Sequence, residues 1–140
     1  MANTTQTTKL THAGALKMLD AAVKKAEAMG VPQCIAIVDE GCNLLAFSRM
    51  DGSKVLSIDT ATAKARTSAS SKAPTGKTPP EYELKMAIAT GGKFANLKGG
   101  LPVIVGGVCV GGIGVGSGTG DQDVECAAAA LAAIGAQTSF

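Results

Sequence analysis

The sequence predicts an α+β (α/β) fold in which an antiparallel sheet lies between helices. Residues 33–40 are apolar at both alternating positions, as in a strand that is buried on both faces. Residues 33–40 and 44–50 form one pair of strand-like runs joined by a turn, and residues 103–105 and 108–115 form another. Segments of helical period precede, separate and follow these hairpins, which gives the order α-β-β-α-α-β-β-α.

The first helix is expected over residues 11–29. Thr11 suits its N-cap, Gly30 suits the position just past its end, and Pro32 stops its continuation. Its expected buried stripe consists of Leu16, Leu19, Val23 and Ala26.

Two helices are expected between the hairpins. The first covers residues 53–70, where Ala61, Ala65 and Ala69 form a smooth stripe that allows close packing against the sheet. After a loop at 71–77, the second runs from 79 to 89. We expect Thr78 to cap it in a capping box with Glu81.

Gly99 to Asp123 is the most distinctive stretch. Gly106 and Gly107 predict a tight turn between two strands, and Gly111-Gly112 predicts a bulge. A last helix is then expected over residues 121–135, with its buried face at Val124, Ala127, Leu131 and Ile134. Its N-terminal end offers free amide groups and a positive dipole end, a suitable place for an anion.

The composition suits a single domain over residues 10–140, with a frayed arm at 1–9. A net charge of +2 and few aromatic residues argue against nucleic acid as a partner. The polar first residues resemble no signal peptide, so we expect a cytoplasmic protein that does not enter a membrane. The four cysteines are expected to be reduced, with only Cys42 exposed.

Several catalytic patterns fail on spacing or composition. The glycines from 112 to 118 do not fit G-x-G-x-x-G, and Gly76-Lys77-Thr78 lacks the first glycine of a P-loop. His12 is the only histidine and lies near the chain start, which disfavours Cys–His and Ser–His–Asp chemistry. Asp121 and Glu125 could share a cation, but acidic residues in a first helical turn ordinarily serve the helix dipole.

Arg49 has two readings. At the end of a strand it could clamp a carboxylate, with Lys64 and Arg66 of the next helix adding positive charge. Alternatively, it pairs with Asp39, Glu40 or Asp51 and stiffens the hairpin.

Residues 37–52, IVDEGCNLLAFSRMDG, resemble a signature of the GlcG/HbpS family, which includes the C-terminal module of PduO-type proteins. Residues 99–103 and 110–115 and the Asp121-Gln122-Asp123 start of the last helix resemble a second signature. The resemblance covers about residues 9–137. The chain departs from the family pattern at Cys42, where the family usually has glycine, and at Ser117, where the hydroxyl has moved by one residue.

The resemblance implies a profilin-like, three-layer α/β/α fold and a homo-oligomer between a dimer and an octamer. It also implies haem binding in some members, with His12 as the candidate axial ligand here, and links to corrinoid metabolism or catabolic operons. Met86 and other methionines are alternative ligands.

Two functions follow from these observations. The first is a ligand-binding accessory protein for haem, another tetrapyrrole or a small anionic metabolite. Its expected site contains Arg49, Thr75, Gly76, Gly99, Gly100, Leu101, Pro102, Gly116, Ser117 and Gly118. The second is a cofactor-free lyase or isomerase acting on a carboxylated intermediate. There Arg49 orients the substrate, and Glu81, Asp121 or Asp123 serves as acid or base.

Overall fold

The computed structural model describes residues 1–140. Its helices and strands follow the predicted order. They are α1 His12–Met29, β1 Cys34–Asp39, β2 Leu44–Arg49, α2 Ser57–Ser71, α3 Pro80–Ala89, β3 Gly100–Val105, β4 Val108–Gly116 and α4 Gly120–Ala133.

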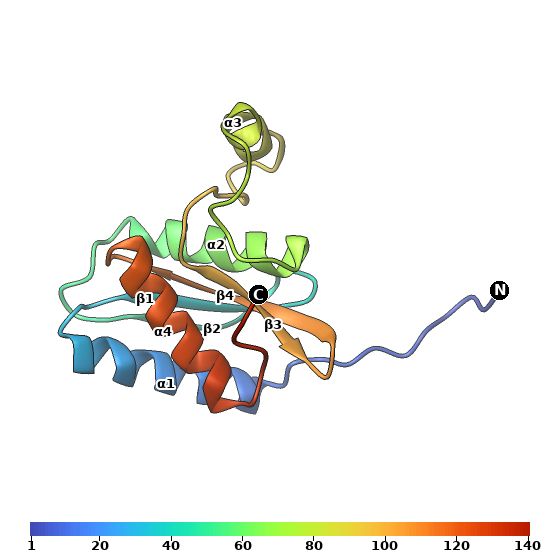
Figure 1. The fold of residues 1–140 in the computed structure, drawn as a ribbon, viewed down its shortest axis with the longest axis horizontal. Coiled ribbons are helices and arrows are strands. Elements are labelled where there is room, and N and C mark those ends of the chain that lie inside the picture. Colours follow the sequence, from blue (N-terminus) through green and yellow to red (C-terminus); the bar gives the residue numbers. More distant parts are fainter.

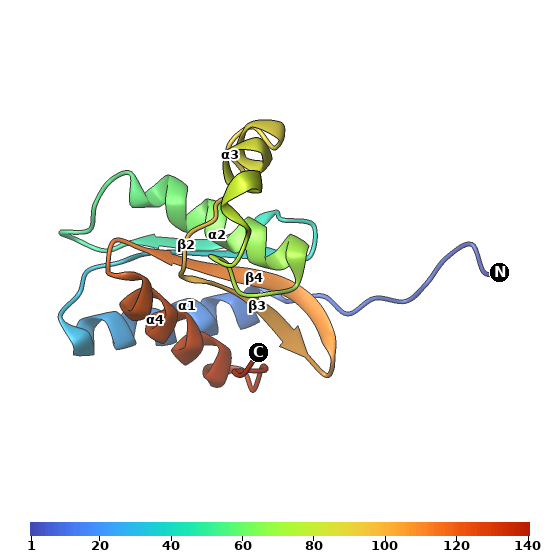
Figure 2. The ribbon, with the colours of Figure 1, turned by 45° about the horizontal axis from the view of Figure 1, so that its top comes forward.

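The sheet has four strands in the order β2-β1-β4-β3, and every neighbouring pair is antiparallel. Helices α1 and α4 cover one face and α2 covers the other, while α3 projects from the body beyond α2 (Figures 1 and 2). Every residue of the central strand β1 is buried. The predicted α+β class and three-layer arrangement are therefore confirmed.

The core is divided by the sheet into two unequal parts. The larger part lies on the α1/α4 side and includes Met18, Ile37, Ile113 and Leu131. The smaller part lies under α2 and consists of short side chains such as Ala36, Ala61 and Ala65. The α2 side is thus a close-packed layer of small residues.

Helix α1 begins and ends as expected, with Thr11 as N-cap and Gly30 in a left-handed conformation (φ 68°). The predicted stripe is wrong in one position, because Leu16 is 46% exposed. The fully buried residues are Ala15, Met18, Ala22 and Ala26. Small residues on this face let α1 approach both the sheet and α4, and this double contact decides which face is buried.

Helix α2 begins at Ser57, four residues later than predicted, and no side chain caps it. The Ala61, Ala65 and Ala69 stripe is buried as expected. It lies against glycines of β4, where a Cβ at Gly112 or Gly114 would collide with a carbonyl oxygen of α2. Those glycines are therefore needed for helix-to-sheet contact.

The predicted bulge at Gly111-Gly112 is displaced. Val103 pairs with Gly111 and Ile104 pairs with Cys109, so Val110 is the extra residue of β4. Val110 is buried in the larger core. The bulge is fixed by the burial of this valine, and the two glycines serve the packing of α2.

The expected capping box at Thr78 is also wrong. Helix α3 starts at Pro80, and no side-chain bond caps it. The Thr78 amide instead donates to the Asn96 side chain, at 3.0 Å. This contact ties the two ends of the segment that carries α3.

Helix α4 starts with a capping box formed by Thr119 and Gln122 and ends at Ala133, two residues earlier than expected. Ala127 and Leu131 are fully buried as predicted, whereas Val124 and Ile134 are only partly buried. Cys126, which the predicted face omitted, is fully buried as well.

Residues 1–9 carry no helix or strand and extend away from the body in Figure 1. None of the helices has the length and apolarity that crossing a bilayer requires. No disulfide joins the four cysteines, and Cys42 is partly buried, not exposed as expected.

Candidate functional site

Most of the predicted ligand-binding residues gather at one end of the sheet, where β3 starts and β4 ends. Thr75 is buried there, and its hydroxyl donates to the Leu97 carbonyl (2.5 Å) and accepts from the Gly100 amide (2.8 Å). Leu101 and Pro102 are buried in β3. The polar groups of this region thus bond mainly to one another.

A buried ion pair occupies the middle of this region. Lys64 Nζ lies 3.0 Å from Asp123 Oδ2 and donates to the Val115 carbonyl at 2.8 Å. Both side chains are at least nine-tenths buried. The pair joins α2, β4 and α4 across the sheet end. It takes Asp123 out of contact with solvent, so Asp123 is not placed to act as an acid or base.

Sequence reasoning gave Lys64 only a role beside Arg49. The signal that could have placed it is its spacing, because Lys64 lies three residues after Ala61 and four before Ser68, both of which are buried. A lysine on the buried face of a helix requires an acidic partner.

The backbone amide groups at the start of α4 already donate to side chains of the same protein. Thr119 Oγ1 accepts from the Gln122 amide (3.2 Å), and Gln122 Oε1 accepts from the Thr119 amide (2.9 Å). The Gly118 amide donates to Gln33 Oε1 (2.9 Å) and Asp123 Oδ1 (3.1 Å). An anion at this helix end would have to displace a carboxylate and two amide side chains.

Ser117 also turns inward. It adopts a left-handed conformation (φ 97°), and its hydroxyl accepts from the Lys54 amide at 2.9 Å. The shifted hydroxyl of this chain therefore fixes the loop before α2.

The remaining candidates lie apart from one another. Arg49 is exposed and forms no ion pair, so the alternative in which it pairs with Asp39, Glu40 or Asp51 is not observed. It lies at the level of Gly116, two strands away, because both pair with Cys34. Glu81 is exposed on α3, and His12 is exposed at the start of α1.

The acidic residues of α4 have basic partners. Asp121 accepts a hydrogen bond from Lys98, which lowers the pKa of that carboxyl, and Glu125 lies 3.9 Å from Lys25. No three His, Cys, Asp or Glu side chains are grouped as a metal site would require.

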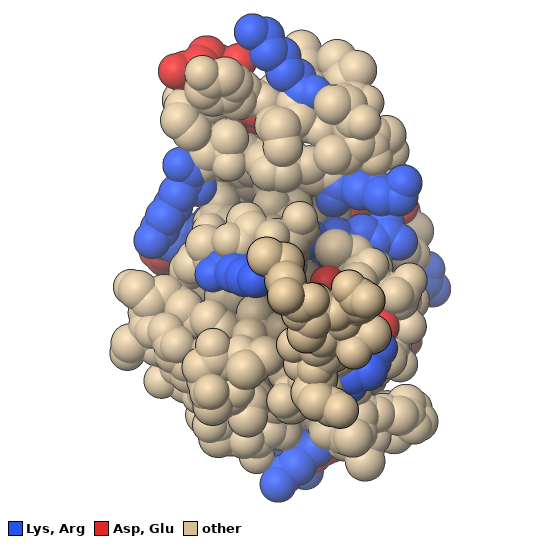
Figure 3. Space-filling view, turned by 90° about the vertical axis from the view of Figure 1, so that its right-hand side faces the viewer, with Lys and Arg blue, Asp and Glu red and all other residues tan.

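A different region forms a cleft, between α2 and the α3 projection. It has a volume of about 640 Å³. The space-filling view shows that the surface narrows between the projection and the body, with basic side chains on both flanks (Figure 3). Its lining consists of Cys42, Arg66, Thr67, Ser70, Ser71, Met86, Ala89, Thr90, Gly91, Lys93 and Phe94.

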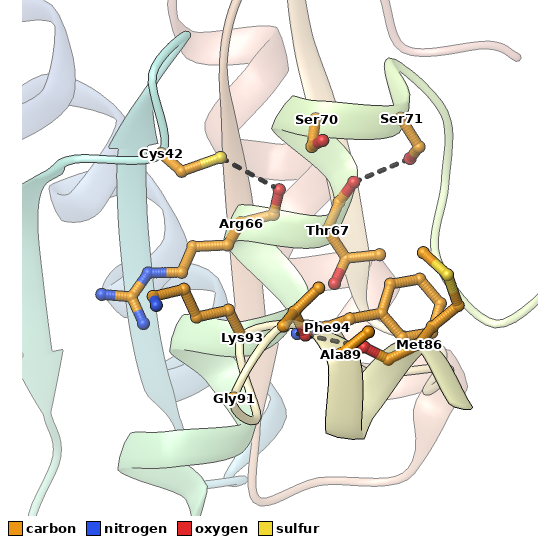
Figure 4. Close-up of a pocket in the computed structure, with 11 residues that line it drawn as sticks. Cys42, Arg66, Thr67, Ser70, Ser71, Met86, Ala89, Gly91, Lys93 and Phe94 are labelled. Carbon is orange, nitrogen blue, oxygen red and sulfur yellow. Dashed lines mark hydrogen bonds between the residues drawn. The ribbon is translucent and has the colours of Figure 1, made fainter. Parts of the chain in front are cut away.

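One end of the cleft is cationic. The side chains of Arg66 and Lys93 extend toward the same edge in Figure 4, and neither forms an ion pair. Both also line an adjoining polar hollow with Asp59 and Thr62. Two basic groups without a carboxylate partner favour an anion at this edge.

The other end is apolar. Met86 and Phe94 lie together there in Figure 4, and Ala89 adds a third apolar side chain. Two hydrogen bonds donated by the chain after α3 hold this wall of the cleft. The Phe94 amide donates to Thr90 Oγ1 (3.0 Å), and the Ala95 amide donates to Thr67 Oγ1 on α2 (3.0 Å).

Cys42 closes the cleft from the β1–β2 turn. It has a left-handed backbone (φ 66°), and its thiol donates to the Arg66 carbonyl at 3.4 Å. Burial raises the pKa of this thiol, so it stays protonated near neutral pH. Cys42 is therefore a packing residue of the cleft and no thiolate nucleophile.

Asp39 orders the turn that carries Cys42. Its Oδ1 accepts from the amides of Gly41 and Asn43, each at 2.9 Å. Burial acts to raise the pKa of this carboxyl, but the hydrogen bonds from Asn43 and Gly41 outweigh it, so the pKa is lowered.

Sequence reasoning missed this cleft. The sequence predicts Arg66 and Arg49 in one anion site. Arg49, however, lies at the level where α2 starts, and Arg66 lies about two turns further along that helix. Lys93 joins Arg66 only because the chain returns after α3. No local pattern in the sequence brings these two cations together.

Comparison with known proteins gives a consistent family. The model of the family described as "Haem degrading protein HbpS-like" matches residues 10–132. An uncharacterised 15.0 kDa protein of the dhaT-dhaS intergenic region of Citrobacter freundii is 34% identical, over 90% of this chain and 92% of its own length.

Solved structures agree with this match. The Klebsiella pneumoniae protein ORFY superimposes with a TM-score of 0.88 at 31% identity, covering 98% of each chain. The structure of PduOC in complex with haem gives a TM-score of 0.85 at 26% identity and covers 95% of this chain and 100% of the other. The family match over residues 10–132, the 34% identical relative and these solved structures together show that the chain belongs to the HbpS-like family.

Proposed function

We propose that this chain is a small-molecule-binding protein whose ligand combines an apolar body with carboxylate groups, and that it binds in the cleft between α2 and α3. The observation that carries the proposal is the pair of unpaired cations, Arg66 and Lys93, at one end of a cleft with an apolar wall. A volume of about 640 Å³ suits a ligand of this size.

Haem is the first ligand to test. The haem complex of PduOC and the family description support it. The residues present fit its outline, because Arg66 and Lys93 match two propionates, and Met86 and Phe94 match the edge of an apolar macrocycle. Within the cleft the sulfur donors are Met86 and Cys42, while His12 lies on α1 across the sheet. Haem would supply an iron centre, and the chain's own residues bind and orient it.

The enzymatic alternative has less support. The proposed acid/base residues Glu81, Asp121 and Asp123 lie on α3 and α4, and neither they nor Arg49 line the cleft or the adjoining polar hollow. Asp121 is paired with Lys98, and Asp123 with Lys64. A binding role needs no such grouping.

Haemin titration followed by the Soret band tests the proposal. Arg66→Ala is expected to weaken binding about 10- to 150-fold, because one charge-assisted contact contributes roughly 1.5–3 kcal/mol. Arg49→Ala removes an exposed arginine outside the cleft and is expected to leave the affinity unchanged.

His12→Ala distinguishes haem binding in the cleft from haem binding at His12. If the cleft holds the ligand, this variant keeps the wild-type Soret shift. A shift lost in His12→Ala or Arg49→Ala but kept in Arg66→Ala would place the ligand elsewhere. No shift in the wild type would remove haem as the ligand.

A further inference from the structure

The polar hollow that adjoins the cleft has a character of its own. Its volume is about 570 Å³. Its lining contains no hydrophobic residue and consists of Asp59, Thr62, Arg66, Gly91, Gly92 and Lys93. Arg66, Gly91 and Lys93 also line the cleft, so the two spaces meet there. In Figure 4 the side chains of Arg66 and Lys93 extend away from Met86 and Phe94, so the cations point out of the apolar part of the cleft.

One wall of the hollow is a single face of α2 that carries both signs of charge. Asp59, Thr62 and Arg66 follow one another at intervals of three and four residues, the spacing that brings helical side chains to one face. Asp59 lies about 10.5 Å before Arg66 along the helix axis. The same rigid helix therefore holds a negative and a positive group at separate places along the hollow.

The opposite wall has few side chains of its own. Gly91 and Gly92 follow α3 in left-handed conformations (φ 63° and 82°), and a Cβ added to either glycine would meet no atom within 4 Å. Lys93 then brings its ammonium group to the same edge as the Arg66 guanidinium (Figure 4). The glycines thus leave the charged groups of α2 open to a ligand.

The hollow presents acceptors at one end and donors at the other. Thr62 Oγ1 donates to the Ile58 carbonyl at 2.6 Å, so it can only accept a hydrogen bond from a ligand. With the Asp59 carboxylate it forms an acceptor end that suits an ammonium group. Arg66 and Lys93 have donors only, which suit a carboxylate.

The two ends do not satisfy each other. Asp59, Arg66 and Lys93 form no ion pairs. Helical ion pairs form at three or four residues, and Asp59 and Arg66 are seven residues apart. The opposite charges of the hollow therefore stay available to a ligand.

Ligands with a single charge use only one end. A simple anion at Arg66 and Lys93 leaves the Asp59 carboxylate unpaired. A divalent metal ion at Asp59 finds a single carboxylate, because no three His, Cys, Asp or Glu side chains are grouped in the chain. A molecule that carries both charges matches both ends.

We propose that the hollow binds a small zwitterion, whose primary ammonium group lies at Asp59 and Thr62 and whose carboxylate lies at Arg66 and Lys93. A spacer of a few carbon atoms joins the two groups, because Asp59 and Arg66 stand about two helical turns apart. The inference rests on the proposed function only in that Arg66 and Lys93 also line the cleft.

Equilibrium dialysis with radiolabelled γ-aminobutyrate, in the absence of haemin, tests the proposal. Butyrate and n-butylammonium each keep one of its two charges on the same carbon chain. Both are expected to compete at least about 10-fold more weakly than unlabelled γ-aminobutyrate, because each leaves one end of the hollow unpaired. No retained γ-aminobutyrate, or equal competition by butyrate, would overturn the proposal.

Matched substitutions test the acceptor end. Asp59→Asn removes the negative charge at nearly constant size and is expected to lower the affinity for γ-aminobutyrate to that for butyrate. Asp51→Asn makes the same change at an exposed aspartate outside both spaces and is expected to leave the affinity unchanged. Equal affinities of these two variants for γ-aminobutyrate would show that its ammonium group does not lie at Asp59.

Arg66→Ala tests the donor end. It is expected to weaken the binding of γ-aminobutyrate and butyrate alike and to leave n-butylammonium unchanged. The same loss for all three compounds would contradict a carboxylate-specific contact. Retained γ-aminobutyrate in a protein that gives no Soret shift with haemin would remove the haem function and leave the zwitterion site, and the reverse result would remove the zwitterion site alone.

Discussion

Cys42 and Ser117 both have a left-handed backbone, with φ of 66° and 97°. Such conformations cost a non-glycine residue of order 1–3 kcal/mol. In each case the side chain has a compensating contact, Cys42 with the Arg66 carbonyl and Ser117 with the Lys54 amide. Cys42 thereby places a thiol in the candidate cleft.

The turn that carries Cys42 depends on the ionised form of Asp39. Because the folded-state pKa of this carboxyl is lowered, its contribution is present above the unfolded value of about 3.9 and is lost as pH falls through the folded pKa. Asp39→Asn is expected to cost about 1 kcal/mol of unfolding free energy at neutral pH.

Urea denaturation at several pH values checks this. The difference between wild type and Asp39→Asn is expected to shrink below about pH 4, since only the wild type loses a charged acceptor there. A difference that stays constant between pH 7 and pH 3 would show that Asp39 acts without its charge.

At the scale of elements, the contact between α2 and β4 decides the architecture. Alanines 61, 65 and 69 lie directly over Gly112 and Gly114, so backbone meets backbone. The sequence predicted both the alanine stripe and the glycine-rich strand, because each has a clear local pattern. It did not predict that they meet, since glycine in a strand has several uses and only the three-dimensional contact distinguishes them.

Gly114→Ala tests this contact. Its Cβ would collide with the Ala61 carbonyl of α2, and overpacking of this kind costs typically 1–3 kcal/mol or more. Gly106 lies in an open turn with φ 57°, which asparagine tolerates, so Gly106→Asn is expected to change stability little. Thermal and urea unfolding of both variants measure the difference, and equal stabilities would mean that α2 can move away from the sheet at no cost.

The buried Lys64–Asp123 pair links α2 to α4. Lys64→Met leaves the Asp123 carboxylate buried without its cation and is expected to destabilise the fold by about 3–5 kcal/mol. Lys64→Met/Asp123→Leu removes both charges and is expected to recover much of that loss.

Unfolding free energies of the wild type, both single variants and the double variant make a double-mutant cycle. Additive effects of the two substitutions would contradict a coupled pair. A large coupling energy supports a role as a structural connection at the sheet end.

At the scale of the whole molecule, two regions are candidates for the ligand site. The sheet end that the sequence favoured has its polar groups bonded within the chain, at Thr75, at Lys64–Asp123 and at the start of α4. The cleft between α2 and α3 has basic groups without partners. The element order was predictable because it rests on local periodicity. The cleft was not, because Arg66 and Lys93 come together only through the path of the chain around α3.

Hydrogen exchange of the protein with and without haemin is the most direct test of the cleft as the ligand site. We predict slower exchange in the second half of α2, around residues 66–71, and in residues 86–94, with no change at the sheet end. Protection confined to residues 99–102 and 116–123 would contradict the account and return the site to the glycine-rich stretch.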